Sequence, residues 1–348
     1  MNVVTENINS SQKTIVLQRL TALWAFTESG LGGVMHALQI PFTGLLVGGM
    51  AVIMISMIAE LSEHNYKQIL KSALIVLIVK AMVSPHTPFP AYIAVSFQAL
   101  LGYCLFSLMK VNTISILLLS IIAMLESAVQ KLLILTLFLG ELLWKAADGL
   151  IALLAEQFGF TTINGSYWII AIYLFIYIAG AVVIALLALR TIKSFHTDKA
   201  VAITALISIP DVDSVIKKPV RKNKFKKLWL LIGLMLGLSV LLFFFASNAK
   251  QGWLAVLKTI SWTLSAILIW YMIIGPLFTK AIQNFLQKKQ SRYSNEVLQI
   301  LSFIPVLRQL TLLAWQHSKL SKGFGRWNSF VSTLIQATLT YTEPPAAK

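Results

Sequence analysis

The hydrophobic residues of this 348-residue chain fall into long runs separated by short polar segments. A helix that crosses a bilayer needs about 20 mostly apolar residues. Runs of this length recur along the sequence, so we expect an all-α polytopic membrane protein with about eight transmembrane helices. The expected spans are residues 15–38, 42–62, 67–83, 91–109, 112–139, 166–190, 228–247 and 254–279.

Lysine and arginine residues mark one side of these spans. The positive-inside rule places basic loops in the cytoplasm. Lys13 and Arg19 put the N-terminus there, and a basic cluster at residues 217–227 follows the sixth span. Further lysines and an arginine follow the last span at residues 280–292. We therefore expect both termini in the cytoplasm and the chain in the cell inner (plasma) membrane.

Two segments have apolar residues at helical spacing but are not expected to span. Residues 141–158 predict an amphipathic helix along the outer interface, anchored by Trp144. This helix could be a substrate gate or only a lipid-contacting lid. Residues 294–340 are moderately apolar, but Pro305 and several basic residues interrupt the apolar pattern. They predict one or two amphipathic helices on the cytoplasmic surface.

These patterns divide the chain into five regions. Pro210 and Pro219 break any long helix between the sixth and seventh spans, which indicates a linker there. The regions are a polar N-terminal tail (1–14), a six-helix substrate-binding unit (15–195), a basic cytoplasmic linker (196–227), a transmembrane hairpin (228–290), and cytoplasmic amphipathic helices with a tail (291–348).

Composition supports the membrane assignment. The chain is 57% hydrophobic and only 12% charged, against about 25% charged residues in a typical soluble domain. Its net charge of +16 comes from basic residues that flank apolar runs, so it indicates orientation and not nucleic-acid binding. The single cysteine, Cys104, cannot form an internal disulfide, and the polar N-terminus has no pattern of a cleaved signal peptide.

Small residues recur at every fourth position of the first expected span, which places them on one helix face. Such a stripe lets another helix backbone approach closely in lipid. We expect this face to dock another helix. Its residues are Ala25, Ser29, Gly33 and Ala37.

Glu28 and His36 lie on an adjoining face of the same helix. A carboxylate near the middle of a membrane helix costs about 2.5–3.5 kcal/mol on insertion scales, so it normally faces protein or a wet cavity. This pairing therefore indicates a membrane-embedded site. Glu126 is likewise a carboxylate within a spanning helix, here the fifth, and needs compensation. Lys80, Lys131 or a protonated state could supply it. Glu126 either locks the bundle in a charge pair or contacts a substrate.

Polar and aromatic side chains gather at the expected outer ends of the first six spans. A few polar groups among aromatic faces are typical of a small-molecule pocket, and also of an interfacial aromatic belt. For Trp168 the belt is the favoured interpretation. The candidate substrate-binding residues are Glu28, His36, Gln39, Thr43, His86, Thr87, Tyr92, Gln98, Glu126 and Trp168.

The sequence carries no enzyme signature. The motifs G-x-x-x-x-G-K-[ST], G-x-S-x-G and H-E-x-x-H are absent, so we expect no catalytic residues and no cofactor. His36 and His86 could meet as metal ligands, but no ligand spacing supports this, and no metal site is predicted. Energised transport would need an ATPase on another polypeptide. The sequence also lacks an inverted repeat with broken helices, which is the pattern that would indicate a secondary transporter.

Residues 15–195 resemble the substrate-binding S component of an energy-coupling-factor (ECF) transporter. The resemblance rests on the small-residue stripe, on H-A-L-Q-I-P-F-T-G at residues 36–44 followed by V-G-G at 47–49, and on S-P-H-T-P-F-P-A-Y-I-A-V-S-F-Q-A-L-L-G at 84–102. It implies a six-helix cup, open to the outside, for a vitamin or a metal. It also implies that the stripe docks a T component and that two ATPases drive transport.

The C-terminal part departs from an S component. Its hairpin and basic amphipathic helices are similar, more weakly, to the end of a T component, and Lys322-Gly323-Phe324-Gly325-Arg326 only distantly resembles a coupling motif. A fused, T-like module is one hypothesis for residues 294–340. A lipid-surface anchor is the other, because anionic lipid attracts basic segments by about 1 kcal/mol per charge.

We therefore expect the membrane-embedded capture subunit of a small-molecule, vitamin-like uptake transporter that relies on separate ATPase subunits. The expected partners are a neutral or aromatic small molecule, a T component with ATPases, and anionic lipid at the basic cytoplasmic segments. No nucleic-acid partner is expected. The alternative is a non-transport membrane scaffold or assembly protein whose polar residues only hold the bundle together.

Overall fold

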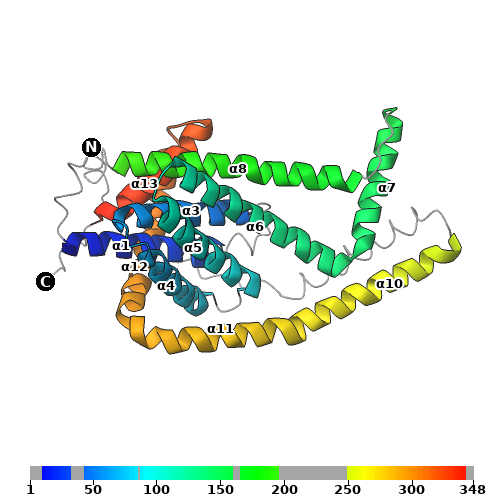
Figure 1. The fold of residues 1–348 in the computed structure, drawn as a ribbon, viewed down its shortest axis with the longest axis horizontal. Coiled ribbons are helices and arrows are strands. Elements are labelled where there is room, and N and C mark those ends of the chain that lie inside the picture. Colours follow the sequence, from blue (N-terminus) through cyan, green and yellow to red (C-terminus); the bar gives the residue numbers. More distant parts are fainter. Residues whose placement is uncertain (1–9, 33–42, 85–86, 160–164, 196–248, 342–348) are drawn as a thin grey trace. The chain divides into compact units, whose positions relative to one another are not determined.

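The computed structural model describes residues 10–32, 43–84, 87–159, 165–195 and 249–341, and these ranges contain helices but no strand. Figure 1 shows the helices in chain order. They are α1 (Ser10–Phe26), the π-helix η2 (Thr27–Leu31), α3 (Thr43–Leu61), α4 (Lys67–Val83), α5 (Phe89–Met109), α6 (Thr113–Leu139), α7 (Glu141–Gln157), α8 (Gly165–Phe195), α10 (Ala249–Leu268), the π-helix η6 (Ile269–Ile274), α11 (Gly275–Gln290), the 3-10 helix η7 (Ser291–Tyr293), α12 (Ser294–Ser318) and α13 (Gly323–Thr340).

The chain is a helical membrane protein. In the described ranges, five helical stretches are long and apolar enough to span a bilayer: α3, α5, α6, α8 and the stretch that begins at Ile260. Helices α1 and α4 are 17 residues each; α1 overlaps residues 15–26 of the first expected span, and α4 has the same bounds as the third. The expected span at residues 228–247 lies outside the described residues.

The chain divides into two compact units. Helices α1, α3, α4, α5, α12 and α13 lie wholly in the first, and α7 and α10 lie wholly in the second. The first unit comprises Met1–Ala128, Ile176–Ile209 and Phe278–Lys348, and the second comprises Val129–Phe175 and Pro210–Leu277.

Helix α3 forms the centre of the first unit. It is apolar on all sides and most of its residues are buried, as expected of a helix surrounded by others. Glycines let its neighbours approach closely: a Cβ on Gly49 would lie 2.7 Å from Cδ1 of Ile184 on α8. Similarly, a Cβ on Gly102 of α5 would lie 2.5 Å from Cγ2 of Ile55 on α3. The bundle core therefore depends on small residues at helix crossings.

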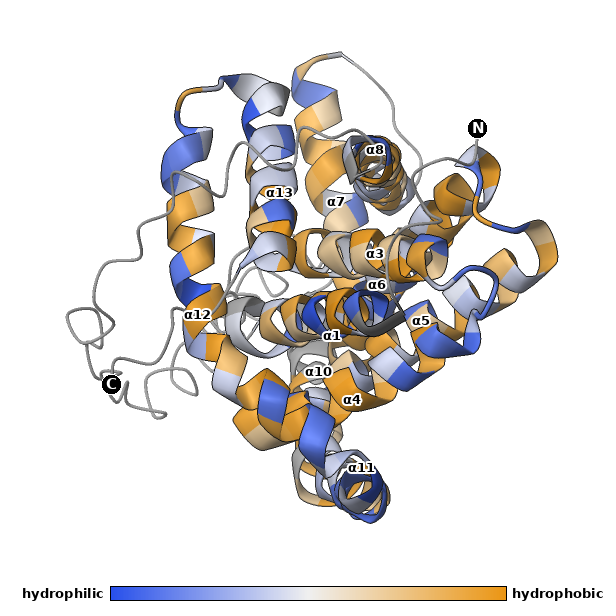
Figure 2. Cartoon of the chain, turned by 90° about the vertical axis from the view of Figure 1, so that its left-hand side faces the viewer, coloured by the Kyte–Doolittle hydropathy of each residue, from blue (hydrophilic) through white to orange (hydrophobic). Residues whose placement is uncertain are grey.

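The C-terminal helices pack against the N-terminal ones (Figures 1 and 2). Arg19 of α1 donates a hydrogen bond from Nη1 to the backbone oxygen of Leu339 at 2.6 Å, and its guanidinium lies 6.0 Å from the ring centre of Phe303 on α12. Lys71 of α4 forms an ion pair with Glu296 of α12 at 3.3 Å. Amphipathicity alone left open whether lipid or protein covers α12 and α13, and here protein covers one face of each.

Two features of this C-terminal pair bear on the sequence analysis. Pro305, one of the residues that interrupt the apolar pattern of 294–340, lies inside α12 and does not end it. The amphipathic pattern of α13 is confirmed, because Val331, Leu334 and Ile335 are buried. Hydrophilic and hydrophobic residues alternate along both helices in Figure 2.

The second unit contains the predicted amphipathic helix, which is α7. Its Asp148 accepts a hydrogen bond from the backbone N–H of Ser166, in the first turn of α8, at 2.6 Å. Trp144 Nε1 donates to Thr136 Oγ1 at 3.1 Å. The apolar side chains Leu150, Leu153 and Leu154 are exposed, which is the pattern of a helix that lies in a bilayer interface.

We predict that Gly102→Ala destabilises the bundle by about 1–3 kcal/mol, because the added methyl overlaps Ile55 in a packed core. Gly149→Ala, in α7, is the matched control: nothing lies within 4 Å of its Cβ position, so the change should stabilise the helix by about 0.5–1 kcal/mol. Thermal unfolding of both variants in detergent measures the difference. Equal melting temperatures would contradict close packing of α3 on α5.

Candidate functional site

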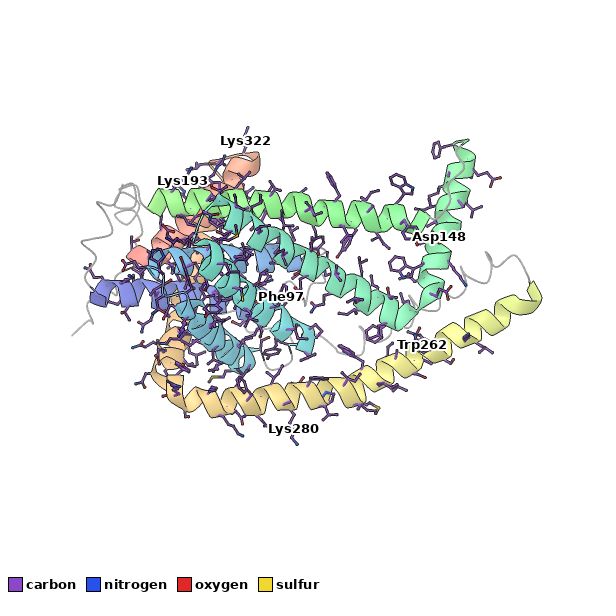
Figure 3. The ribbon with its side chains drawn as sticks, viewed as in Figure 1. Phe97, Asp148, Lys193, Trp262, Lys280 and Lys322 are labelled. Atoms are coloured by element: carbon purple, nitrogen blue, oxygen red, sulfur yellow. The ribbon has the colours of Figure 1, made fainter. Side chains whose placement is uncertain are left out.

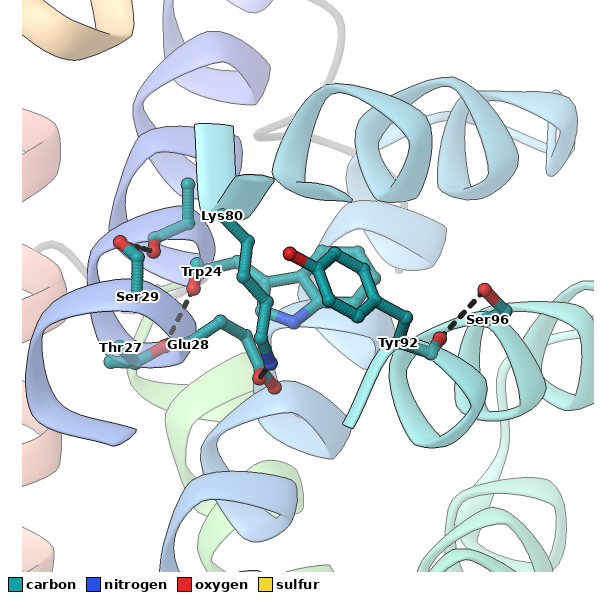
Figure 4. A network of polar contacts seen from close by, with 8 residues as sticks. Trp24, Thr27, Glu28, Ser29, Lys80, Tyr92 and Ser96 are labelled. Carbon is teal, nitrogen blue, oxygen red and sulfur yellow. Dashed lines mark hydrogen bonds and ion pairs between the residues drawn. The ribbon is translucent and has the colours of Figure 1, made fainter. Parts of the chain in front are cut away.

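Glu28 forms a buried ion pair with Lys80 of α4. Nζ of Lys80 lies 2.7 Å from Oε2 of Glu28, and each side chain is only 5% exposed (Figure 4). A lone charge at such a position would be strongly unfavourable, since its hydration is lost without replacement. The expected compensation of Glu28 by neighbouring protein is therefore present. The ion pair links η2 to α4.

Local backbone structure directs Glu28 towards α4. The residue lies in the π-helical turn η2, where an extra residue in the turn reorients the side chains, and such turns are frequent at functional sites. The neighbouring hydroxyls bond back to the preceding turn. Thr27 Oγ1 donates to the Trp24 oxygen at 2.8 Å, and Ser29 Oγ donates to the Ala25 oxygen at 2.6 Å. The polar group of this turn that reaches α4 is thus the Glu28 carboxylate.

Two buried hydrogen-bonding groups beside the pair have no partner among the described residues. They are Nε1 of Trp24 and the hydroxyl of Tyr92. Trp24 is fully buried and lies four residues before Glu28 on α1, while the Tyr92 ring centre is 6.0 Å from Nζ of Lys80. Figure 4 shows both rings with the ion pair. An unsatisfied buried donor costs about 1–3 kcal/mol, so these groups call for a partner.

A second polar group lies along α3. Gln98 of α5 is buried, its Oε1 has no described partner, and its Nε2 lies 3.0 Å from where a Cβ on Gly48 would be. On the same helix, a Cβ on Gly44 would lie 3.3 Å from Cβ of Ser127 on α6. Polar side chains therefore meet the glycine-rich face of α3 from both α5 and α6.

The residues described so far form two clusters in the first unit. The pair cluster is Trp24, Glu28, Lys80 and Tyr92, and the glycine-face cluster is Gly44, Gly48, Gln98 and Ser127. Both sets share α5, which carries Tyr92 and Gln98. Together they offer hydrogen-bond donors, acceptors and aromatic faces, which are the components of a small-molecule site.

Glu126 is placed differently from Glu28. It is half-buried on α6, and its Oε2 is buried without a described partner. Lys80, one of the groups considered as its compensation, pairs with Glu28 instead, so that interpretation is wrong. Lys131 and a protonated carboxyl both stay open. Glu126 directly precedes Ser127, but consecutive residues of a helix point in different directions, so the two side chains lie on different faces of α6.

The remaining candidates divide into placed and unplaced residues. Thr43 is buried at the start of α3, and Thr87 is half-buried before α5. Trp168 lies in the second unit and is 61% exposed, which favours its interpretation as part of an aromatic belt. The predicted site residues His36, Gln39 and His86 lie outside the described residues.

The small-residue stripe is partly described. Ala25 and Ser29 are buried, whereas Gly33 and Ala37 lie outside the described residues. Within the described ranges, no three histidine, cysteine or acidic side chains come together in the way that a metal site requires.

Sequence reasoning missed Trp24 and the role of Lys80. Trp24 has a usable signal, because it precedes Glu28 by four residues and a residue at that spacing lies one turn away. Lys80 was considered only for Glu126. Nothing in the local sequence distinguishes two acids that compete for one lysine, since the choice depends on which helices are neighbours.

We predict that Glu28→Gln or Lys80→Met destabilises the protein by about 3–5 kcal/mol, because either change leaves a buried charge unpaired. The double variant Glu28→Leu with Lys80→Met should lose much less stability, since it removes both charges. Thermal unfolding of the single and double variants measures the coupling. Additive losses would contradict the pairing.

Lys71→Met is the matched control on the same helix. Lys71 and Glu296 are 41% and 25% exposed, so breaking their pair should cost less than about 1 kcal/mol. A loss as large as that of Lys80→Met would mean that burial does not set the cost.

Comparisons with known proteins assign no family to the chain: no protein-family model, no curated protein and no solved structure matches it. Its function is therefore argued from its own residues and geometry.

Proposed function

We propose that this chain is the substrate-capturing subunit of a small-molecule uptake transporter in the plasma membrane, and that it relies on separate ATPase subunits. In this proposal the chain has eight spans with both termini in the cytoplasm. The first six spans form the binding unit, as in the ECF S components that residues 15–195 resemble. The bound compound is vitamin-like.

The observation that carries the proposal is the pair cluster with its unpartnered polar atoms. Glu28 and Lys80 satisfy one another, but Nε1 of Trp24 and the hydroxyl of Tyr92 are buried without a described partner. A bundle that only needed stability would do better with apolar side chains at these positions. Polar groups kept at such a cost are typical of functional sites in membrane proteins.

The chemistry of the cluster indicates the ligand class. Because the charges of Glu28 and Lys80 offset each other, the cluster favours a neutral compound over an ion. The indole N–H of Trp24 can only donate, so the ligand must offer an acceptor such as a carbonyl oxygen or a ring nitrogen. The Tyr92 and Trp24 rings favour an aromatic or other flat compound.

The dependence on an ATPase rests on the sequence. The chain has no P-loop motif, so ATP hydrolysis must come from another polypeptide. The stripe Ala25, Ser29, Gly33 and Ala37 is proposed as the docking face for a T component. The packing of α12 and α13 on α1 also supports a fused, T-like role for the C-terminal helices.

The alternative function is a membrane scaffold or assembly protein. A specific observation favours it, because Glu28 and Lys80 fully compensate each other and would lock α1 to α4 without any ligand. The two functions differ in what they require of Tyr92. A scaffold does not need a hydroxyl that makes no hydrogen bond to a described residue, whereas a binding protein does.

We predict that Tyr92→Phe leaves the melting temperature of the ligand-free protein unchanged or slightly higher, because the lost hydroxyl has no described partner. The same variant should lose most of the thermal stabilisation that a bound compound gives by mass action. The measurement is a thermal shift of full-length protein in detergent against a panel of water-soluble vitamins. Mass spectrometry of co-purifying small molecules guides the panel.

Tyr103→Phe, on the same helix and half-buried, is the matched control and should keep the ligand response of the wild type. The capture proposal is overturned if no compound shifts the wild-type protein and none co-purifies with it. It is also overturned if Tyr92→Phe lowers ligand-free stability as much as Glu28→Gln does, because the hydroxyl would then have a structural partner instead of being kept for a ligand.

A further inference from the structure

A cavity in the first unit differs in chemistry from the pair cluster. Its volume is about 600 Å³, within the range of about 300–1,000 Å³ that is usual for sites of small molecules. The start of η2, α3 and α8 line one part of it, and α12 and α13 line the other. We call it the C-terminal groove, because it exists only where α12 and α13 pack against the N-terminal helices.

The lining of the C-terminal groove has almost no free hydrogen-bonding group. Its two threonines use their hydroxyls internally: Thr27 Oγ1 donates to the Trp24 oxygen at 2.8 Å, and Thr311 Oγ1 donates to the Leu307 oxygen at 2.7 Å. The rest of the lining is glycine, aliphatic or aromatic. A polar solute would lose its hydration there without replacement, so the groove suits an apolar chain.

One edge of the groove is aromatic and carries a positive charge. Trp315, Trp327 and Phe330 line the groove and contact one another edge to face, with ring centres 5.6 to 6.4 Å apart. The guanidinium carbon of Arg326 lies 4.4 Å over the Trp315 ring. Nε of Arg326 is buried and has no partner among the described residues. A cation with an unused donor therefore stands beside an apolar groove.

The sequence around this edge contains no negative charge. No Asp or Glu occurs between Glu296 and Glu343, whereas Lys319, Lys322 and Arg326 fall within eight residues. Lys322 is exposed at the turn between α12 and α13 (Figure 3). Basic side chains next to a bilayer attract anionic lipid, and indole rings favour the interface between lipid and water.

We infer that the C-terminal groove binds an acyl chain of an anionic phospholipid and that Arg326 binds the phosphate of its headgroup. The apolar lining of the groove and its positively charged edge together match an amphiphile with an apolar tail and an anionic head. A guanidinium is well suited to phosphate, because its planar donors can bind two oxygens at once. A lipid in this position would contact α12 and α13 as well as α3 and α8. The inference rests on the groove alone and does not require the compound proposed to bind at the pair cluster.

Native mass spectrometry tests the inference on the full chain released from nanodiscs that contain equal amounts of phosphatidylglycerol and phosphatidylcholine with identical acyl chains. The wild-type protein should retain phosphatidylglycerol in preference to phosphatidylcholine. Arg326→Gln should reduce that preference about fivefold, which corresponds to ~1 kcal/mol for one basic residue. Lys288→Gln, an exposed lysine on α11, should leave it unchanged.

The groove itself is tested by a filling substitution. Leu312→Trp places a larger side chain in the lining of the groove and should remove most of the retained lipid, whereas Leu298→Trp, exposed on the same helix and outside the groove, should not. A photoreactive acyl chain on phosphatidylglycerol should label wild-type residues 311–315 and 327–334, which tests the site even if Leu312→Trp does not fold.

The inference would be overturned by the absence of any retained lipid, by equal retention of the two headgroups by the wild type, or by photolabelling spread evenly over the spans. Retention of detergent alone, or occupation by a second copy of the chain, would show as a different mass and would also overturn it.

Discussion

The ion pair between Glu28 and Lys80 is the interaction that the rest of the structure depends on. Two opposite charges, each almost completely buried, can stay in a lipid-immersed bundle only if each compensates the other. The pair fixes η2 against α4, and Thr21 Oγ1 strengthens the same junction with a 2.8 Å hydrogen bond to Ser72 Oγ. Because the charges satisfy one another, Trp24 and Tyr92 keep unused polar atoms beside them. The proposed capture site rests on this difference between the paired charges and the polar atoms of Trp24 and Tyr92 that have no described partner.

The end of α1 and the start of η2 contribute side chains both to the pair cluster and to the C-terminal groove. Trp24 and Glu28 belong to the pair cluster, whereas the neighbouring residues Phe26 and Thr27 line the apolar C-terminal groove. Trp24 and Phe26 lie in α1 and Thr27 and Glu28 begin η2, so the helical period turns these side chains towards different faces. A polar compound on one face and a lipid chain on the other would both bear on the same short segment. Movement of η2 would therefore affect both sites at once.

Much of the fold could be predicted from the sequence, because backbone groups in lipid must be satisfied within helices and long apolar runs therefore become spans. The ranges 42–62 and 91–109 match α3 and α5 within two residues at each end. The amphipathic helix at 141–158 was likewise predictable from its period. These are local properties, and local sequence determines them.

The site was less predictable, since it depends on which helices become neighbours. The sequence indicated that Glu28 needs compensation but not that Lys80, 52 positions away, supplies it. The amphipathic period of residues 327–335 indicated a buried face, but it could not distinguish lipid from the N-terminal helices as the cover. Pro305 did not end α12, although proline removes a helix hydrogen bond. For Glu28 and for residues 327–335, tertiary packing decided what the local pattern left open.

Solid-state NMR of the full chain in lipid tests the central interaction most directly. A dipolar coupling between ¹⁵Nζ of Lys80 and the ¹³C carboxyl of Glu28 measures their separation, and the carboxyl shift reports its charge. We predict a strong coupling, in keeping with the 2.7 Å contact between Nζ and Oε2, together with the shift of an ionised carboxylate. A protonated Glu28 without coupling to Lys80 would contradict the pairing.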